Sequence, residues 1–117
     1  MSLDQLSDET GRFRVLAVDH RDSLRAFLSP DEPEGVSAAH MTAIKRDLVA
    51  ALSPVATGVM LEPEYSIPQV LDVLAPGVGF LAALESQGYL ADPTAQATTL
   101  FWSVEEYELL LFILGGR

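Results

Sequence analysis

The sequence contains three short apolar runs, and the segments between them have apolar residues at helical spacing. The runs lie at residues 13–18, 58–61 and 78–84, and hydrophobic side chains follow one another in them with little polar alternation. Continuous apolar runs of this length are typical of strands that are buried on both faces, as in parallel sheets. The pattern therefore predicts three strands of a parallel sheet.

Helical patterns fill the connections between these runs. Residues 22–28 predict a short helix, and residues 37–53 predict a longer one. The apolar positions of the longer helix are Met41, Ile44, Leu48 and Leu52. Ser66, with a proline two residues later, predicts a helix before the third run. The capping-box pattern Ser-x-x-Glu at Ser103 predicts a last helix from Val104 to about Leu114, after a long loop. This order of elements favours an α/β fold.

Length, charge and cysteine content narrow the possible functions. The chain has 117 residues, enough for one domain, with 7 Lys and Arg against 17 Asp and Glu and a formal charge of −10. A chain with this negative charge lacks the basic surface that nucleic acids and anionic membranes require. We therefore expect neither as a partner. No apolar run is long enough to span a bilayer, and the first residues lack the basic start of a signal peptide. The absence of cysteine excludes thiolate chemistry and agrees with a cytoplasmic location.

Each predicted strand is followed by a carboxylate. Asp19, Glu62 and Glu85 come directly after the first, second and third apolar runs. Because the carboxyl ends of parallel strands meet at one face, these side chains could divide acid and base roles or bind a divalent cation. The alternative is structural: each carboxylate caps the helix that follows its strand.

Further polar side chains stand near the same predicted face. Arg21, two residues after Asp19, is a cation suited to a phosphate group, although a solvated ion pair is the alternative. His20 has no second His or Cys nearby with which to bind a metal. The side chain of Glu64 either points toward this face of the sheet or lies in solvent beside a turn. The chain contains no glycine-rich dinucleotide loop in the right context and no Gly-x-Ser-x-Gly sequence.

Four ordered sequence blocks resemble the tagatose-bisphosphate aldolase family. They are Val-Leu-Ala-Val-Asp-His-Arg-Asp-Ser-Leu at 15–24, Leu-Ser-Pro-Val-Ala leading into Val-Met-Leu-Glu-Pro-Glu-Tyr at 52–65, Ala-Leu-Glu-Ser-Gln-Gly-Tyr at 83–89, and Thr-Thr-Leu with Trp-Ser-Val-Glu at 98–105. The resemblance covers residues from about 11 to 105. It implies a class I aldolase, which works through a Schiff base, has a (β/α)₈ barrel and cleaves a ketose phosphate such as tagatose 1,6-bisphosphate into triose phosphates.

The resemblance also implies a domain plan. A complete barrel needs roughly 250 residues, so the chain is expected to hold the N-terminal three or so β/α units of a TIM barrel. Residues 1–117 would form a single partial barrel domain, of which residues 106–117 are a divergent, apolar helical tail. Three strands leave an open sheet edge, so self-association through that edge and the tail is expected.

The resemblance assigns roles to the residues at the strand ends. The expected catalytic residues are Asp19, Glu62 and Glu85, and the expected substrate-binding residues are His20, Arg21 and Glu64. The expected partner is a sugar phosphate, and neither a metal nor another cofactor is expected. The lysine amine that attacks the ketone in this family is missing, because the one lysine, Lys45, lies in the middle of a predicted helix. We therefore expect a truncated aldolase that is inactive alone.

Two alternatives to the aldolase interpretation remain open at this point. In the first, the acidic strand ends hold a small ligand or a metal while the apolar tail mediates assembly. In the second, the chain is a frameshift product without a function.

Overall fold

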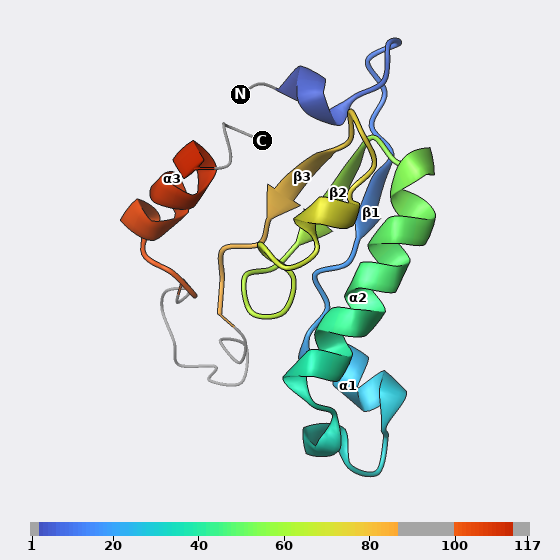
Figure 1. Cartoon of the computed structure of the whole chain (residues 1–117), viewed down its shortest axis with the longest axis vertical. Helices are drawn as coiled ribbons and strands as arrows, with labels where there is room; N and C mark the ends of the chain where they lie inside the picture. The colour runs from blue at the N-terminus through green and yellow to red at the C-terminus, as the bar shows by residue number, and fades with distance from the viewer. Residues whose placement is uncertain (1–2, 87–99, 114–117) are drawn as a thin grey trace, which may run out of the picture.

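A three-stranded parallel sheet forms the centre of the molecule (Figure 1). The computed structural model describes residues 3–86 and 100–113. Strands β1 (Val15–Ala17), β2 (Gly58–Leu61) and β3 (Gly79–Ala82) pair in the order β1-β2-β3, with Leu16 opposite Val59 and Val59 opposite Phe80. The predicted α/β class with parallel strands is confirmed, and the sheet is open: β1 and β3 are its outer strands in the described part of the chain.

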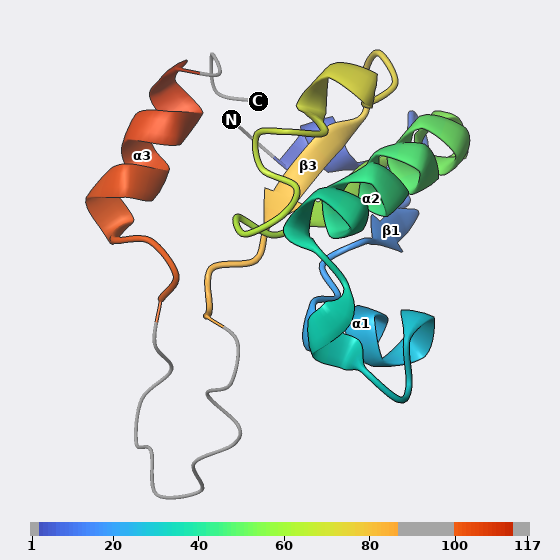
Figure 2. The same cartoon turned by 60° about the horizontal axis from the view of Figure 1, so that its bottom comes forward.

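Two helices form the crossover from β1 to β2. Helix α1 (Asp22–Leu28) follows the first strand, and helix α2 (Ala38–Leu52) runs along the sheet (Figures 1 and 2). The hydroxyl of Ser37 accepts a hydrogen bond from the backbone N–H of His40 at 3.1 Å, which caps the start of α2. Both helices agree with the sequence pattern. Short 3-10 turns occur at Leu3–Leu6, Pro33–Gly35, Ser53–Val55 and Leu71–Val73.

The helix predicted to begin at Ser66 does not form, and that prediction was wrong. Between β2 and β3 the chain makes turns, with the 3-10 turn at Leu71–Val73 as its helical piece. The buried hydroxyl of Ser66 donates to the backbone oxygen of Glu62 at 2.7 Å and accepts from the backbone N–H of Glu62 at 3.0 Å. Ser66 therefore closes the turn behind it instead of capping a helix ahead of it.

The hydrophobic core lies between one face of the sheet and the chain that covers it. Its buried members are Val18, Val49, Val59, Leu61, Ile67, Val70, Leu74, Val78 and Phe80. Each such side chain contributes about 1.5–3 kcal/mol when fully buried. A smaller cluster of Val36, Met41 and Tyr65, packed against Leu24 and Leu28, joins α1 to α2.

The N-terminal turn Leu3–Leu6 covers part of the opposite face of the sheet. Neighbouring strand positions face opposite sides, so Gly58 lies on the face away from the buried Val59. A Cβ on Gly58 would come within 2.9 Å of a Leu6 methyl group, and one on Gly79 within 2.8 Å of the Gln5 carbonyl oxygen. Glycine at these positions therefore permits the turn to approach the sheet closely.

Helix α3 (Val104–Ile113) lies on the β3 side of the sheet, away from α2 (Figures 1 and 2). The Ser103 hydroxyl accepts from the backbone N–H of Glu106 at 3.1 Å, as the capping pattern predicts. The Tyr107 hydroxyl donates to the Leu84 carbonyl oxygen at 3.1 Å, and Trp102 packs against the core. The predicted long loop falls mainly on residues 87–99, and the predicted end of this helix falls at 114–116; both lie outside the described residues. Nowhere in the described residues does a helix have the length and apolar character needed to cross a bilayer.

Candidate functional site

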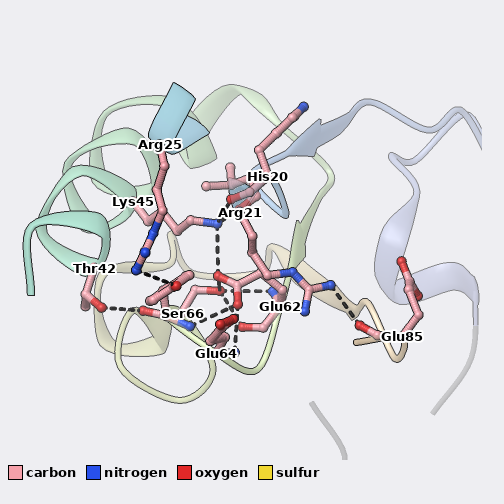
Figure 3. Close-up of polar contacts among 11 residues, drawn as sticks. His20, Arg21, Arg25, Thr42, Lys45, Glu62, Glu64, Ser66 and Glu85 are labelled. Carbon is pink, nitrogen blue, oxygen red and sulfur yellow. Dashed lines mark hydrogen bonds and ion pairs between the residues drawn. The ribbon is translucent and has the colours of Figure 1, made fainter. Parts of the chain in front are cut away.

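The one lysine of the chain reaches the carboxyl ends of β1 and β2 (Figure 3). The side chain of Lys45 is fully buried. Its Nζ donates to the carbonyl oxygens of Val18 at 2.7 Å and His20 at 2.5 Å, and lies 2.9 Å from Oε1 of Glu62. These three contacts use the three donors of an ammonium group. The sequence analysis did not place this lysine at a strand end; the packing of α2 along the sheet does so.

Burial dominates the electrostatics of this lysine. Removal from water lowers the pKa of Lys45 below its ordinary value of 10.5, although Glu62 and Asp19 both favour its charged form. Arg21 acts in the same direction as burial, because a second positive charge nearby disfavours the ammonium. Lys45 therefore stands among two carboxylates and one guanidinium.

The Glu62 carboxylate is fully buried, and both of its oxygen atoms accept hydrogen bonds. Oε1 contacts Lys45 and accepts from the Ser66 hydroxyl at 3.1 Å. Oε2 accepts from the backbone N–H groups of Glu64 at 2.7 Å and Tyr65 at 2.9 Å. Glu62 thus ties α2 to the turn after β2, a structural role close to the capping alternative. Its catalytic role stays a prediction.

Arg21 is buried but only partly hydrogen-bonded. The residue is 3% exposed, and Nη2 donates to the carbonyl oxygen of Glu85 at 2.8 Å. Its Nε and Nη1 atoms are buried and have no hydrogen-bond partner within the structure described. In Figure 3 the side chain extends from the end of β1 to the segment after β3. Each unpaired buried polar group costs about 1–3 kcal/mol, so an anion that accepted from these nitrogens would be stabilised.

The other expected site residues surround this group unevenly. Asp19 is half-buried, and its charge favours the protonated form of Lys45. Glu85 offers its backbone carbonyl to Arg21. The His20 imidazole points away from Lys45 in Figure 3 and lines a cavity of about 290 Å³ beside α1. Glu64, half-buried, raises the pKa of Tyr65 through its charge, after the larger effect of burial.

The three strand-end carboxylates do not gather into a metal site. Among residues 3–86 and 100–113, no three His, Cys, Asp or Glu side chains lie close enough together to hold a metal ion. Glu62 is already occupied by Lys45 and by the turn after β2. The divalent-cation site that the sequence left open is therefore not formed by Asp19, Glu62 and Glu85 in this part of the chain.

Sequence reasoning did not assign Lys45 to this site, although a signal was present. The buried residues of α2 are Met41, Lys45 and Val49, spaced four apart. The predicted stripe instead ran through Leu48 and Leu52, which are 38% and 40% exposed. A lysine in the middle of an apolar stripe at helical spacing indicates a buried polar partner, because a lysine is almost never fully buried unless it is paired.

A second contact that the sequence did not predict links α1 to the turn after β2. Nη2 of Arg25 donates to the Tyr65 hydroxyl at 2.7 Å, and the guanidinium lies 5.2 Å from the centre of the Tyr65 ring. The Thr42 hydroxyl of α2 donates to the Tyr65 carbonyl oxygen at 2.7 Å. Tyr65 therefore holds α1 and α2 to the same turn that carries Glu62.

Comparison with known proteins identifies relatives of this chain. No family model matches it. Tagatose 1,6-diphosphate aldolase of Streptococcus agalactiae serotype V is 33% identical over 87 residues, which are 74% of this chain and 26% of the relative. Tagatose 1,6-diphosphate aldolase 2 of Streptococcus mutans is 31% identical over 107 residues, 88% of this chain and 32% of the relative. The Staphylococcus aureus enzyme of that name is 31% identical over 88 residues, 75% of this chain and 27% of the relative.

The chain thus spans about a quarter to a third of the length of these curated relatives. The similarity is nevertheless repeated across several species at similar identity, over most of this chain. It agrees with the resemblance noted in the sequence. Over 74–88% of its length, the chain is therefore a homologue of tagatose 1,6-diphosphate aldolases and matches part of each of them.

Proposed function

We propose that the chain carries part of the active site of a class I aldolase, which cleaves a ketose bisphosphate such as tagatose 1,6-bisphosphate through a Schiff base. The names of the relatives support the reaction. The parallel strands and their helical crossover suit the first β/α units of a (β/α)₈ barrel, within one partial domain. Asp19, Glu62 and Glu85 retain their proposed catalytic roles.

The observation that carries the proposal is the partly unpaired guanidinium of Arg21. Its Nε and Nη1 atoms are buried and without partners at the strand ends, the place where α/β barrels bind substrates. Each of these atoms carries an N–H donor, and a hydrogen bond from a guanidinium to a phosphate oxygen is among the stronger ones in proteins. We propose that Arg21 binds a phosphate of the sugar. His20 and Glu64 are proposed as lesser contacts.

We further propose that the chain binds this substrate without cleaving it alone. Schiff-base formation needs a lysine amine that is free and accessible to the ketone. Lys45 is fully buried, and its three donors are engaged by Val18, His20 and Glu62. No other lysine is present in the sequence. Cleavage would therefore require a lysine that these 117 residues do not supply. Self-association through the sheet edge and the tail stays a prediction.

Calorimetric titration with tagatose 1,6-bisphosphate tests the binding role. Arg21→Gln removes the guanidinium, and Arg46→Gln removes one that is paired with Asp72 at the surface. A hydrogen bond to a charged group contributes about 1.5–3 kcal/mol, so Arg21→Gln is expected to weaken binding roughly 10- to 100-fold. Arg46→Gln is expected to bind as the wild type does. Equal affinity for all three proteins would refute the role of Arg21.

Reductive trapping tests the absence of cleavage. The wild-type chain is incubated with tagatose 1,6-bisphosphate and borohydride and weighed by intact mass spectrometry. We expect no covalent adduct, because the buried ammonium of Lys45 cannot reach a ketone. A stoichiometric adduct at Lys45 would contradict this part of the proposal while leaving the role of Arg21 intact.

A further inference from the structure

We infer that the buried Lys45–Glu62 ion pair is a positioning device that sets the direction of Arg21 at the strand ends. The inference rests on the proposed anion-binding role of Arg21. It gives Lys45 and Glu62 a role that requires no contact with the ligand and is separate from the catalytic role proposed for Glu62: Lys45 fixes the backbone that precedes Arg21, and Glu62 fixes Lys45.

The first step is the contact of Lys45 with the chain between β1 and α1. Nζ binds the carbonyl oxygens of Val18 and His20, on either side of Asp19. The His20 carbonyl belongs to the planar peptide group that contains the Arg21 nitrogen. Holding that oxygen therefore fixes the plane from which the Arg21 residue departs.

The second step is the placement of the ammonium itself. A lysine side chain is long and flexible, so it can hold two carbonyl groups still only if its own end is fixed. Glu62 supplies the fixed point, because its Oε1 contacts Nζ while its Oε2 accepts from the backbone N–H groups of Glu64 and Tyr65. Through this ion pair, the turn after β2 fixes the position of the turn between β1 and α1.

The same turn after β2 also restrains the chain that follows Arg21. The Tyr65 hydroxyl accepts from Arg25, one helical turn beyond Arg21. The chain at Arg21 is therefore restrained on its N-terminal side by Lys45 and on its C-terminal side by the contact between Arg25 and Tyr65. Both restraints lead to the turn that begins at Glu62.

The energetics of buried ion pairs favour a positional role over a purely stabilising one. Replacing such a pair with apolar residues of similar volume is often neutral or stabilising. An apolar pair would fill the space between α2 and β2 equally well. It would not hold the carbonyl oxygens of Val18 and His20, and this is the specific property that Lys45 supplies.

The test compares two ion pairs of α2. The buried pair is removed in Lys45→Met with Glu62→Gln, and the surface pair in Arg46→Met with Asp72→Asn. Two quantities are measured in each protein by nuclear magnetic resonance. One is the hydrogen-exchange rate of the Arg21 Nε–H group without ligand, its signal assigned by its loss in Arg21→Gln. The other is the dissociation constant for inorganic phosphate.

We expect the buried-pair variant to exchange the Arg21 Nε–H group faster and to bind phosphate more weakly. If the turn keeps its competent conformation only about a tenth of the time, the dissociation constant rises about tenfold. The surface-pair variant is expected to match the wild type in both quantities, because Arg46 contacts Asp72 and the Gln69 carbonyl oxygen and not the β1–α1 turn.

The outcomes separate this inference from the proposed function. Unchanged Arg21 exchange in the buried-pair variant overturns the inference, whatever the phosphate result. A wild-type chain that does not bind phosphate refutes the binding role of Arg21, while faster Arg21 exchange in the variant still supports positioning. If the buried-pair variant does not fold, Glu62→Asp replaces it. This variant keeps the charge on a shorter side chain, and the same two measurements decide, with smaller increases expected.

Discussion

Lys45 and Arg46 are neighbours on α2, yet their ion pairs lie in different environments. Both side chains of the Lys45–Glu62 pair are 0% exposed, whereas those of Arg46 and Asp72 are 39% and 67% exposed. Each nitrogen or oxygen atom at the ends of the buried side chains has a specific partner, so the pair fixes geometry. The surface pair is shared with water, which can replace either partner.

The pKa shifts follow the same division. Burial is the largest effect on Lys45 and lowers its pKa in spite of Glu62. At the surface, the hydrogen bond between the partners is the largest effect, and it raises the pKa of Arg46 and lowers that of Asp72. Desolvation therefore opposes the charged form in one region, and pairing favours it in the other.

Removing only one member of the buried pair is expected to have the largest effect on stability. Lys45→Met leaves the Glu62 carboxylate buried without its cation, a change that costs about 3–5 kcal/mol. Urea denaturation measures the loss in the free energy of unfolding. Adding Glu62→Gln should restore much of it, because no unpaired charge then remains. A loss no larger than that of Arg46→Met would remove the distinction between the two regions.

The support of Glu62 provides the next test. Ser66→Ala removes the hydroxyl that bonds the Glu62 backbone and carboxylate, and leaves a buried N–H group without its acceptor. The expected cost is about 1–3 kcal/mol by urea denaturation. Ser7→Ala is the matched control, since the Ser7 hydroxyl makes a single exposed bond to the Asp4 carbonyl oxygen at 3.4 Å. Equal losses in the two variants would show that Glu62 does not depend on Ser66.

The surface pair should respond to salt where the buried pair does not. Arg46→Met is expected to lower stability slightly at low ionic strength, and the difference from the wild type should vanish at high salt because exposed charges are screened. The loss caused by Lys45→Met should persist at both salt concentrations. Thermal unfolding at two ionic strengths measures this. A salt-independent effect of Arg46→Met would mean that its side chain stabilises by packing instead.

The smallest expected effect concerns a carboxylate far from both pairs. Hydrogen bonds from the Thr10 hydroxyl, from backbone N–H groups and from Arg14 hold the pKa of Asp8 well below 3.8. A depressed folded-state pKa contributes stability above 3.8 that is lost as the pH falls through the folded value. Asp8→Asn should therefore be less stable than the wild type at neutral pH, and the gap should close in strong acid. Thermal midpoints across this range would contradict the assignment if the gap stayed constant.

Local sequence signals predicted the elements that depend on near neighbours. Ser37 caps α2 through an N–H group three residues ahead, and Ser103 does the same for α3. The helix predicted from Ser66 failed because a competing partner, Glu62, occupies its hydroxyl. The same residue types thus gave correct and incorrect predictions, depending on whether a tertiary partner competed.

The sequence by itself determined the α/β class, the parallel order of the strands and the presence of charged residues just after each strand. Only the tertiary structure decided which of those charges meet. Lys45 contacts a carbonyl oxygen 27 positions away in the chain, and Arg21 one that is 64 positions away. No local pattern encodes such contacts, because they form only when α2 packs along the sheet and the three strand ends come together.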